Sequence, residues 1–318
     1  MWIVILSSVK DVPSLVRTAC ARVAAQARQV RIEHEAIPAY AASLPLEARA
    51  SEPDPRAHLL TGSAEERAAF WLTLDAINFG SGWFPTLRKR PGRSGYGTVA
   101  GGIRDRFVAS GPWSARELAR VSAPEIAGVL GQDPEHELMA LYSSSLNDLG
   151  RHVAGDHDGE FLAVLEGAGG SAVALAGLLA GWDCFADVST YDGFAVPFYK
   201  RAQIAAADLE DGAVAYWRDL DRLTMFADNL VPHVLRLDGI LRFAPDLVAR
   251  IDRGELIEHG SAEEVEIRAC ALHAVELIVA ARPHGPASAV AVDRVLWNRG
   301  GGPSYKSAPR HRSRCTAY

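Results

Sequence analysis

The sequence has few cysteines, and they form no recognisable pattern. The four thiols lie far apart along the 318 residues, at Cys20, Cys184, Cys270 and Cys315. There is no C-x-x-C pair of the kind that binds zinc, and no dense spacing that predicts a disulfide framework. We therefore expect reduced thiols in a cytosolic environment.

Long hydrophobic runs are also missing. The first residues, MWIVILSSVKDVPSLV, reach the charged Lys10 and Asp11 after a handful of apolar positions, too few for the apolar part of a secretory signal. No other stretch approaches the roughly 18 uninterrupted apolar residues of a membrane span. The sequence predicts a cytoplasmic protein with no membrane association.

Positive charge is in deficit. The formal net charge is −6 at pH 7 and the isoelectric point is about 5.9. Proteins that bind polynucleotides usually present a basic face to the phosphates, so we expect no stable nucleic-acid complex. A small anionic ligand needs only a local basic pocket, which this composition allows.

Several catalytic signatures are absent. The sequence has no G-x-x-x-x-G-K-[ST] loop, no strand-linked G-x-G-x-x-G, no H-E-x-x-H and no G-x-S-x-G. Its ten histidines are scattered. These absences disfavour a metal enzyme or a Ser-His-Asp hydrolase without excluding either.

Helical periodicity is the main pattern present. Apolar residues recur at helical spacing over 12–29, and capping boxes predict helix starts at Ser63 and Ser261. Helices are also expected near Pro232 and over the run ASAVAVDRVLWNRG. Further predicted helices are 114–121, 123–130 behind the cap Ser122, 135–153, 160–166, 171–180 and 197–216.

Sheet content should be small. One or two short strands are expected between Asp183 and Gln203, where aromatic and β-branched residues alternate with polar ones. Prolines and charges over 44–60 predict a surface loop, whereas Trp83, Phe84 and Tyr96 predict an ordered loop after Phe79. We find no repeat and no clear linker, so we predict a mainly α single domain over 1–318, with long ordered loops.

The run PFYKRAQ places Lys200, Arg201 and Gln203 in the first turn of a helix, where cations oppose the helix dipole. A bound anion would favour them, because helix N-terminal amides and a lysine can converge on a phosphate. The alternative is a solvated basic turn.

In TMFADNLVP, Asp228 follows apolar residues and precedes a helix start. An acid in such surroundings can have a tuned pKa and serve catalysis. Equally, Asp228 or Asn229 can cap the helix that includes Val231 and Pro232. The sequence leaves both interpretations open.

Three other sets of polar residues are candidates. Asp75 and Asn78, three apart, are expected on one apolar helix face, paired either with a ligand or with each other. Glu264 and Arg268 have the spacing of a routine surface ion pair. The basic segment PRHRSRCTAY is by default a frayed tail, although its final CTAY allows it to dock.

Five segments together resemble the queuosine salvage protein family, whose members are queuosine 5′-phosphate N-glycosylases, also called hydrolases. They are DAINF at 75–79, FYKRAQI at 198–204, TMFAD at 224–228, EVEIR at 264–268 and HRSRC at 311–315. The resemblance implies a helical fold akin to the helix-hairpin-helix DNA glycosylases. It also implies hydrolysis of queuosine 5′-monophosphate to queuine and ribose 5-phosphate, by a monomer that uses no metal and no organic cofactor.

The resemblance also implies roles for residues in these segments. Asp228 and Lys200 are the catalytic pair, with Asp228 stabilising the oxocarbenium ion and orienting or deprotonating water. The base, a 7-deazaguanine, lacks the N7 that usually accepts a proton, so hydrogen bonds to its other heteroatoms must replace that interaction. The substrate-binding residues are then Asp75, Asn78, Phe79, Trp83, Tyr199, Phe226, Glu264, Arg268, His311, Arg312 and Arg314.

Within that set the roles differ. Asp75 and Asn78 would contact the base, Phe79 or Trp83 would stack on it, and Asp75 or Glu264 would bind the cationic amine of queuine. Lys200, His311 and Arg312 or Arg314 would bind the 5′-phosphate. Two other classes stay open, a modified-nucleotide or tRNA-associated binding protein without turnover and a DNA base-excision glycosylase, the latter disfavoured by the acidic charge.

Overall fold

The computed structural model describes residues 11–46, 53–282 and 287–318. Within these residues the protein is mainly α-helical, as predicted. The α-helices are α1 (Val12–Gln26), α2 (Ile37–Ser43), α3 (Ala64–Ala76), α4 (Gly95–Ser110), α5 (Ala115–Leu118), α6 (Ala123–Leu130), α7 (Glu137–Asp156), α8 (Phe161–Gly167), α9 (Ala172–Leu179), α10 (Lys200–Asp211), α11 (Leu230–Leu237), α12 (Pro245–Asp252), α13 (Ala262–Ala280), α14 (Ala289–Gly300) and α15 (Pro303–Ser307).

The strands form two small antiparallel pairs. In the predicted region, β2 (Val188–Tyr191) pairs with β3 (Phe194–Pro197) through the turn Asp192–Gly193, where both residues have positive φ. An Asp-Gly pair favours this turn because both of its positions require the left-handed region. The second pair, β1 (Val30–Ile32) with β4 (Leu241–Phe243), was not predicted.

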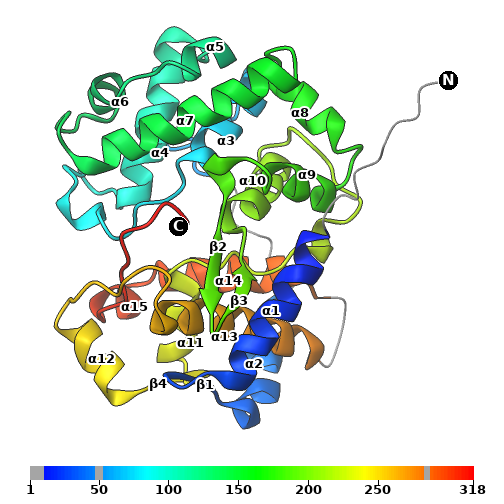
Figure 1. Cartoon of the computed structure of the whole chain (residues 1–318), viewed down its shortest axis with the longest axis vertical. Coiled ribbons are helices and arrows are strands. Elements are labelled where there is room, and N and C mark those ends of the chain that lie inside the picture. The colour runs from blue at the N-terminus through cyan, green and yellow to red at the C-terminus, as the bar shows by residue number, and fades with distance from the viewer. Residues whose placement is uncertain (1–10, 47–52, 283–286) are drawn as a thin grey trace.

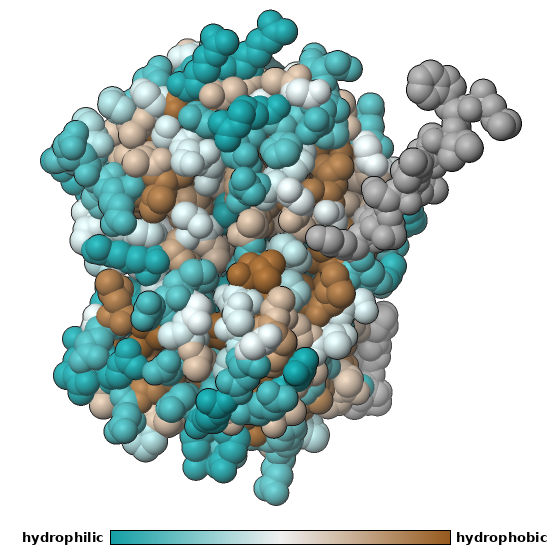
Figure 2. Space-filling model, viewed as in Figure 1, coloured by the Kyte–Doolittle hydropathy of each residue, from teal (hydrophilic) through white to brown (hydrophobic). Residues whose placement is uncertain are grey.

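The helices form two groups (Figure 1). Helices α3 to α10 lie in one group, and α1, α2 and α11 to α15 lie in the other, with the β2–β3 hairpin running between them. The C-terminal segment passes between the two groups and ends beside the first. On the face shown in Figure 2, hydrophilic residues cover the outer ends of both groups, and several hydrophobic residues follow the level where the groups meet.

Helix α13 runs through the second group and is buried on nearly every side. Its buried charges have partners within the fold. Glu266 accepts hydrogen bonds from the main-chain amides of Arg28, Gln29 and Val30 at 2.6–3.0 Å and from the hydroxyl of Tyr191 at 2.7 Å. This carboxylate therefore ties the end of α1 and the start of β1 to the helix, as a buried charge requires.

Helix starts were predicted better than helix interiors. The Ser63 capping box is complete, but Ser261 forms only half of one, since Glu264 bonds to the amide of Gly260 instead of Ser261. The predicted helix 197–216 is shorter, at Lys200–Asp211, because Pro197 belongs to β3. The loop after Phe79 is ordered, but it leads into α4, which was missed.

Glycine explains that omission. Gly101 and Gly102 lie inside α4, where glycine normally weakens a helix. Packing requires glycine at position 102, because a Cβ on Gly102 would lie 2.6 Å from the Leu130 side chain of α6. The predicted surface loop over 44–60 lies partly outside the described residues, and the segment before Asp11 lies wholly outside them.

Within the described ranges, no single helix is long and apolar enough to cross a bilayer. Helices α8 and α9 together reach such a composition, but they are bent by 117° at the break between them. All four cysteines are buried and free of disulfides, as predicted for a reduced protein.

Candidate functional site

Lys200 is the first residue of α10, and its surroundings are built by the loop before it. Its main-chain amide donates to Oδ2 of Asp187 at 3.0 Å, so a carboxylate of the protein itself occupies the N-terminus of the helix. The Lys200 side chain is 5% exposed, and its Nζ donates to the carbonyl of Asn78 at 3.2 Å. Arg201 and Gln203 are buried as well, so the interpretation as a solvated basic turn is wrong.

The Lys200 ammonium lies among carboxylates. Burial lowers its pKa, and the negative charges of Asp228 and then Asp75 raise it. These two acids come from different elements, Asp75 from α3 and Asp228 from the turn before α11. The fold thus brings the two predicted catalytic residues into one electrostatic environment with a predicted base-binding residue.

Asp228 caps α11. Its Oδ1 accepts hydrogen bonds from the amides of Leu230 at 2.7 Å and Val231 at 3.2 Å, which confirms the capping interpretation. The residue is half-buried, and within the described ranges its Oδ2 makes no hydrogen bond. Capping therefore fixes the carboxylate by one oxygen and leaves the other for a ligand.

Asp293 of α14 is a second acid beside Asp228 that the sequence analysis missed. Its Oδ1 accepts from the amide of Phe226 at 3.0 Å, and the side chain is buried. Burial, together with the charge of Asp228, raises the pKa of Asp293 well above its usual range. A single acid in the apolar run AVAVDRVLW was the available signal, of the same kind that singled out Asp228.

Asp75 and Asn78 contact each other, although they do not share a helix face as predicted, because α3 ends at Ala76. Asn78 Nδ2 donates to Asp75 Oδ1 at 3.2 Å. Asp75 is fully buried, and burial raises its pKa to about 6 against the opposing effects of Asn78 and Lys200. Asp208 of α10, which was also missed, lies beside it and has its pKa raised by burial and by Asp75. This pair of carboxyl groups can share a proton near neutral pH.

The C-terminal tail is docked, so the prediction of a frayed tail is wrong. The amide of Gly80 donates to the carbonyl of Tyr318 at 3.0 Å, and Asn229 Nδ2 donates to the carbonyl of His311 at 3.3 Å. A Cβ on Gly82 would lie 2.3 Å from the carbonyl oxygen of Ser313, so this close approach requires glycine. The tail therefore holds both the loop after Phe79 and the turn next to Asp228.

The basic residues of the tail differ in what they can do. His311 is 1% exposed, and burial lowers its pKa to about 3, so it is neutral at pH 7 and the expectation that it supplies positive charge is wrong. Arg312 is half-buried, and Arg314 is an exposed residue whose Nη1 lies 3.7 Å from the Glu137 carboxylate. Arg310, which was not predicted, has its pKa lowered by desolvation, and the nearby charge of Asp228 opposes that effect.

The neutral His311 predicts acid sensitivity. Its pKa is about 3 in the folded protein and 6.5 when unperturbed, so below pH 6.5 the unfolded chain binds the extra proton and stability falls. At pH 5 this costs about 2 kcal/mol of unfolding free energy. His311→Gln should therefore lose less stability between pH 7.5 and 5 in urea unfolding than the wild type does. The exposed His34→Gln variant is the control, and equal losses in all three proteins would contradict the prediction.

Glu264 and Arg268 are not a surface pair, because both side chains are fully buried. Arg268 Nη1 lies 3.7 Å from Glu264 Oε1, and its shorter bonds go to Asp187 and to the carbonyl of Ala227. Burial alone would raise the pKa of Glu264, but His259 and Arg268 together hold it at about 2. The prediction that these two residues touch substrate stays a prediction.

The predicted aromatic residues are also enclosed. Phe79 meets Tyr142 edge to face with ring centroids 5.0 Å apart, and Trp83 Nε1 donates to Glu137 at 2.8 Å. Tyr199 and Phe226 are each less than a tenth exposed. Tyr199 has φ of 49°, a left-handed conformation that is strained for an aromatic residue.

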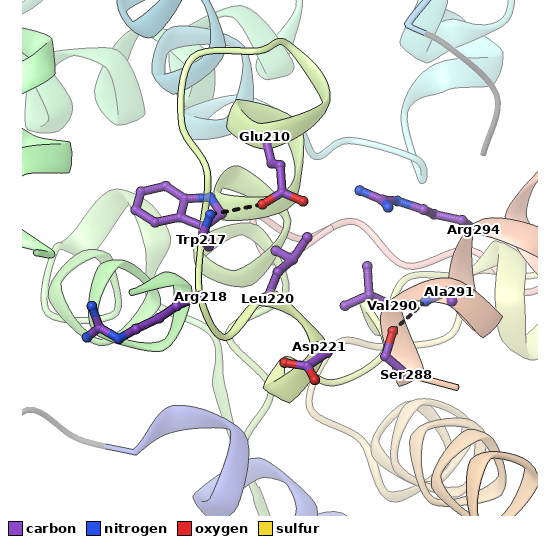
Figure 3. A pocket seen from close by; sticks show the side chains of 9 residues that line it. All are labelled: Glu210, Trp217, Arg218, Leu220, Asp221, Ser288, Val290, Ala291 and Arg294. Carbon is purple, nitrogen blue, oxygen red and sulfur yellow. Dashed lines mark hydrogen bonds between the residues drawn. The ribbon is translucent and has the colours of Figure 1, made fainter. Parts of the chain in front are cut away.

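A surface cavity of about 310 Å³ lies between the end of α10 and the start of α14 (Figure 3). Glu210 accepts from the amide of Trp217 there, and Arg294 points toward the same space from α14. No predicted site residue lines it. The predicted catalytic residues lie instead around Lys200 and Asp228, where a half-buried carboxylate, a buried ammonium and carboxyl groups with raised pKa values meet. Such a set can stabilise a developing cation and supply a proton to a leaving group.

Comparison with known proteins gives a consistent result. A family model described as queuosine salvage protein matches residues 58–318. A protein of Sphaerobacter thermophilus named queuosine 5′-phosphate N-glycosylase/hydrolase is 35% identical over 315 residues, covering 95% of this chain and 97% of its own. Proteins of the same name from Mus musculus and Dictyostelium discoideum are 30% and 29% identical, covering 93% and 78% of this chain and 96% and 77% of their own.

Proposed function

Because the chain belongs to the queuosine salvage protein family, we propose that it releases queuine from queuosine 5′-monophosphate at the cluster around Asp228 and Lys200. It is an N-glycosidase: the bond between C1′ and the base breaks, and the oxygen of water bonds to C1′. The products are queuine and ribose 5-phosphate. The observation that carries the assignment is the meeting of Asp228, Lys200 and Asp75 in one environment.

Asp228 acts on the ribose. Positive charge develops at C1′ as the glycosidic bond breaks, and a carboxylate fixed by one oxygen and open at the other is suited to stabilise it. The same oxygen can orient a water or accept its proton. Lys200 supplies the opposite charge in this buried setting and binds the phosphate or ribose oxygens.

The leaving base needs donors in place of the missing N7. Burial raises the pKa of Asp75 to about 6 and that of Asp208 well above its usual range, which favours the protonated form and supports a role of Asp75, with Asn78, in hydrogen bonding to the base. Phe79 or Trp83 stacks on the ring, and Asp75 or Glu264 binds the queuine amine. Tyr199 and Phe226 complete the walls of the site.

Arg312 and Arg314 are the phosphate ligands of the tail, with Arg310 added by its place near Asp228. The paired variant Arg312→Met and Arg314→Met should raise KM for the nucleotide by about tenfold, and much less for the nucleoside, because only the nucleotide carries the phosphate. Steady-state kinetics with both substrates measure this. Equal changes for nucleotide and nucleoside would remove these residues from the phosphate site.

We further infer a helix-hairpin-helix glycosylase-like arrangement and a single domain over 1–318, acting as a cytoplasmic monomer in tRNA-modification salvage. One continuous cluster of buried apolar side chains, with members from α1 to α14, supports the single domain.

The direct test is incubation of the purified protein with queuosine 5′-monophosphate, with queuine and ribose 5-phosphate followed by chromatography and mass spectrometry. Release of both in equal amounts is expected. Binding without release would instead indicate a modified-nucleotide binding protein. Salt-sensitive binding to duplex DNA with no action on the nucleotide would indicate a DNA glycosylase.

A further inference from the structure

Arg268 lies at the centre of α13 and uses its guanidinium group to join two distant segments. Nη1 and Nη2 donate to the two carboxylate oxygens of Asp187 at 2.9 and 2.7 Å, and Nε donates to the carbonyl of Ala227 at 2.9 Å. Ala227 is the residue immediately before Asp228. One side chain therefore fixes the catalytic turn directly and holds Asp187 at the same time.

Asp187 fixes the other catalytic segment. Its Oδ2 accepts from the amide of Lys200 at 3.0 Å, and its carbonyl accepts from the amides of Phe198 at 2.9 Å and Tyr199 at 3.3 Å. These bonds surround Tyr199, whose left-handed backbone needs outside support. Asp187 thus fixes the first residue of α10, and with it the main-chain position from which the Lys200 side chain extends.

We propose that Asp187 and Arg268 are positioning residues that set the separation of Lys200 and Asp228, an inference that rests on the proposed function. The pair forms a continuous hydrogen-bonded link between the two residues' main chains: Lys200 amide, Asp187, Arg268 and Ala227 carbonyl. The direct bonds of Gln203 to Thr224 join the same two segments farther from Asp228. The positioning role is an alternative to the predicted contact of Arg268 with substrate. It is favoured because bonds within the protein occupy the guanidinium fork of Arg268 and both carboxylate oxygens of Asp187.

The energetics favour a geometric role over a purely stabilising one. A fully buried ion pair gains little stability over well-packed apolar residues, since both charges lose their hydration. The guanidinium lies between the rings of Phe198 and Tyr318, at 3.9 and 4.7 Å from their centroids, which fixes its plane. Lysine cannot replace it, because an ammonium has no planar fork to bond Asp187 at two points while reaching Ala227.

The matched control is on the same helix. Glu266 is also fully buried and charged, but it bonds the segment 28–30 and Tyr191 and touches neither catalytic segment. Glu266→Gln therefore reports the loss of a buried charged contact in α13 without a change at the site. Arg268→Lys and Asp187→Asn are the two test variants, so that one remains if the other fails to fold.

Two measurements test the proposal. Arg268→Lys and Asp187→Asn should each lower kcat on the order of 100-fold with KM changed by less than about threefold, since misplacing reacting groups by about 1 Å has this effect. Glu266→Gln should lower Tm with kcat retained. In an Asp228→Asn background, Arg268→Lys should lower kcat by less than it does in the wild type, because the part of its effect that acts through Asp228 is already lost.

Hydrogen exchange followed by mass spectrometry gives a readout that does not depend on turnover. In Arg268→Lys, amides of 198–203 and 226–231 should both exchange faster, while those of α7 stay unchanged. Exchange that rises in neither segment, or equally throughout the chain, overturns the proposal. So does a kcat loss in Glu266→Gln as large as in Arg268→Lys. A wild type that does not release queuine overturns the proposed function. The exchange pattern still decides whether Asp187 and Arg268 hold the two segments in place.

Discussion

Replacing Asp228 by asparagine is expected to lower kcat on the order of 1,000-fold or more while the protein keeps its fold. The loss corresponds to about 4 kcal/mol of transition-state stabilisation, the scale seen when one strong electrostatic contact to a developing charge is removed. Asparagine keeps an oxygen for the amides of Leu230 and Val231, so the cap of α11 survives. Ligand affinity should change little, because the lost interaction belongs to the transition state.

The controls for this variant separate capping from catalysis. Asp228→Ala removes both functions and should cost a further 1 kcal/mol or so of unfolding free energy relative to Asp228→Asn. Asp246→Asn, at an exposed acid in the first turn of α12, should leave turnover unchanged. Single-turnover release of queuine and urea unfolding measure the two effects. Turnover of Asp228→Asn within tenfold of the wild type would remove Asp228 from catalysis.

Local sequence signals predicted much of the secondary structure. The predicted capping box at Ser63 and the predicted cap at Ser122 mark α3 and α6, because their hydroxyl groups satisfy free amides three residues on. Pairings between remote segments left no such signal. The strands β1 and β4 are three residues each and lie about 200 residues apart in the sequence, so no local sequence pattern predicts their pairing. Helix α4 was hidden by its glycines, of which Gly102 is required for close packing on α6.

The site was located by its motifs, but burial within it was not predictable from spacing. Glu264 and Arg268 have the i,i+4 spacing of a surface pair, and only the fold brings Asp187, 81 residues away, against the guanidinium. Asp293 is a single acid in an apolar run, and the criterion that singled out Asp228 could have found it. Asp208 follows an apolar run but precedes Glu210 and Asp211, so it resembles part of an acidic helix end. The tail was misjudged because its docking depends on Gly80 and Gly82, far away in the sequence.

Lys200→Met is expected to lower kcat/KM on the order of 100-fold without a large loss of stability. Methionine keeps the unbranched stem and removes a buried charge whose hydration was lost on folding, so Tm should change little. Activity should fall because the substrate loses its buried cation. The alkaline limb of the kcat/KM profile should also move to higher pH, because the protonated form of Asp75 donates to the base. Lys200 lowers the pKa of Asp75, so its removal raises that pKa above about 6.

The measurement is a pH profile of kcat/KM from pH 5 to 9 for the wild type, Lys200→Met and Lys306→Met, the last at an exposed lysine of α15. Lys306→Met should follow the wild type. A lower profile with an unmoved alkaline limb would mean that Lys200 binds substrate without setting the protonation of the site. An unchanged profile would mean that the ammonium serves neither purpose, and the assignment of catalysis to this cluster would then rest on Asp228 alone.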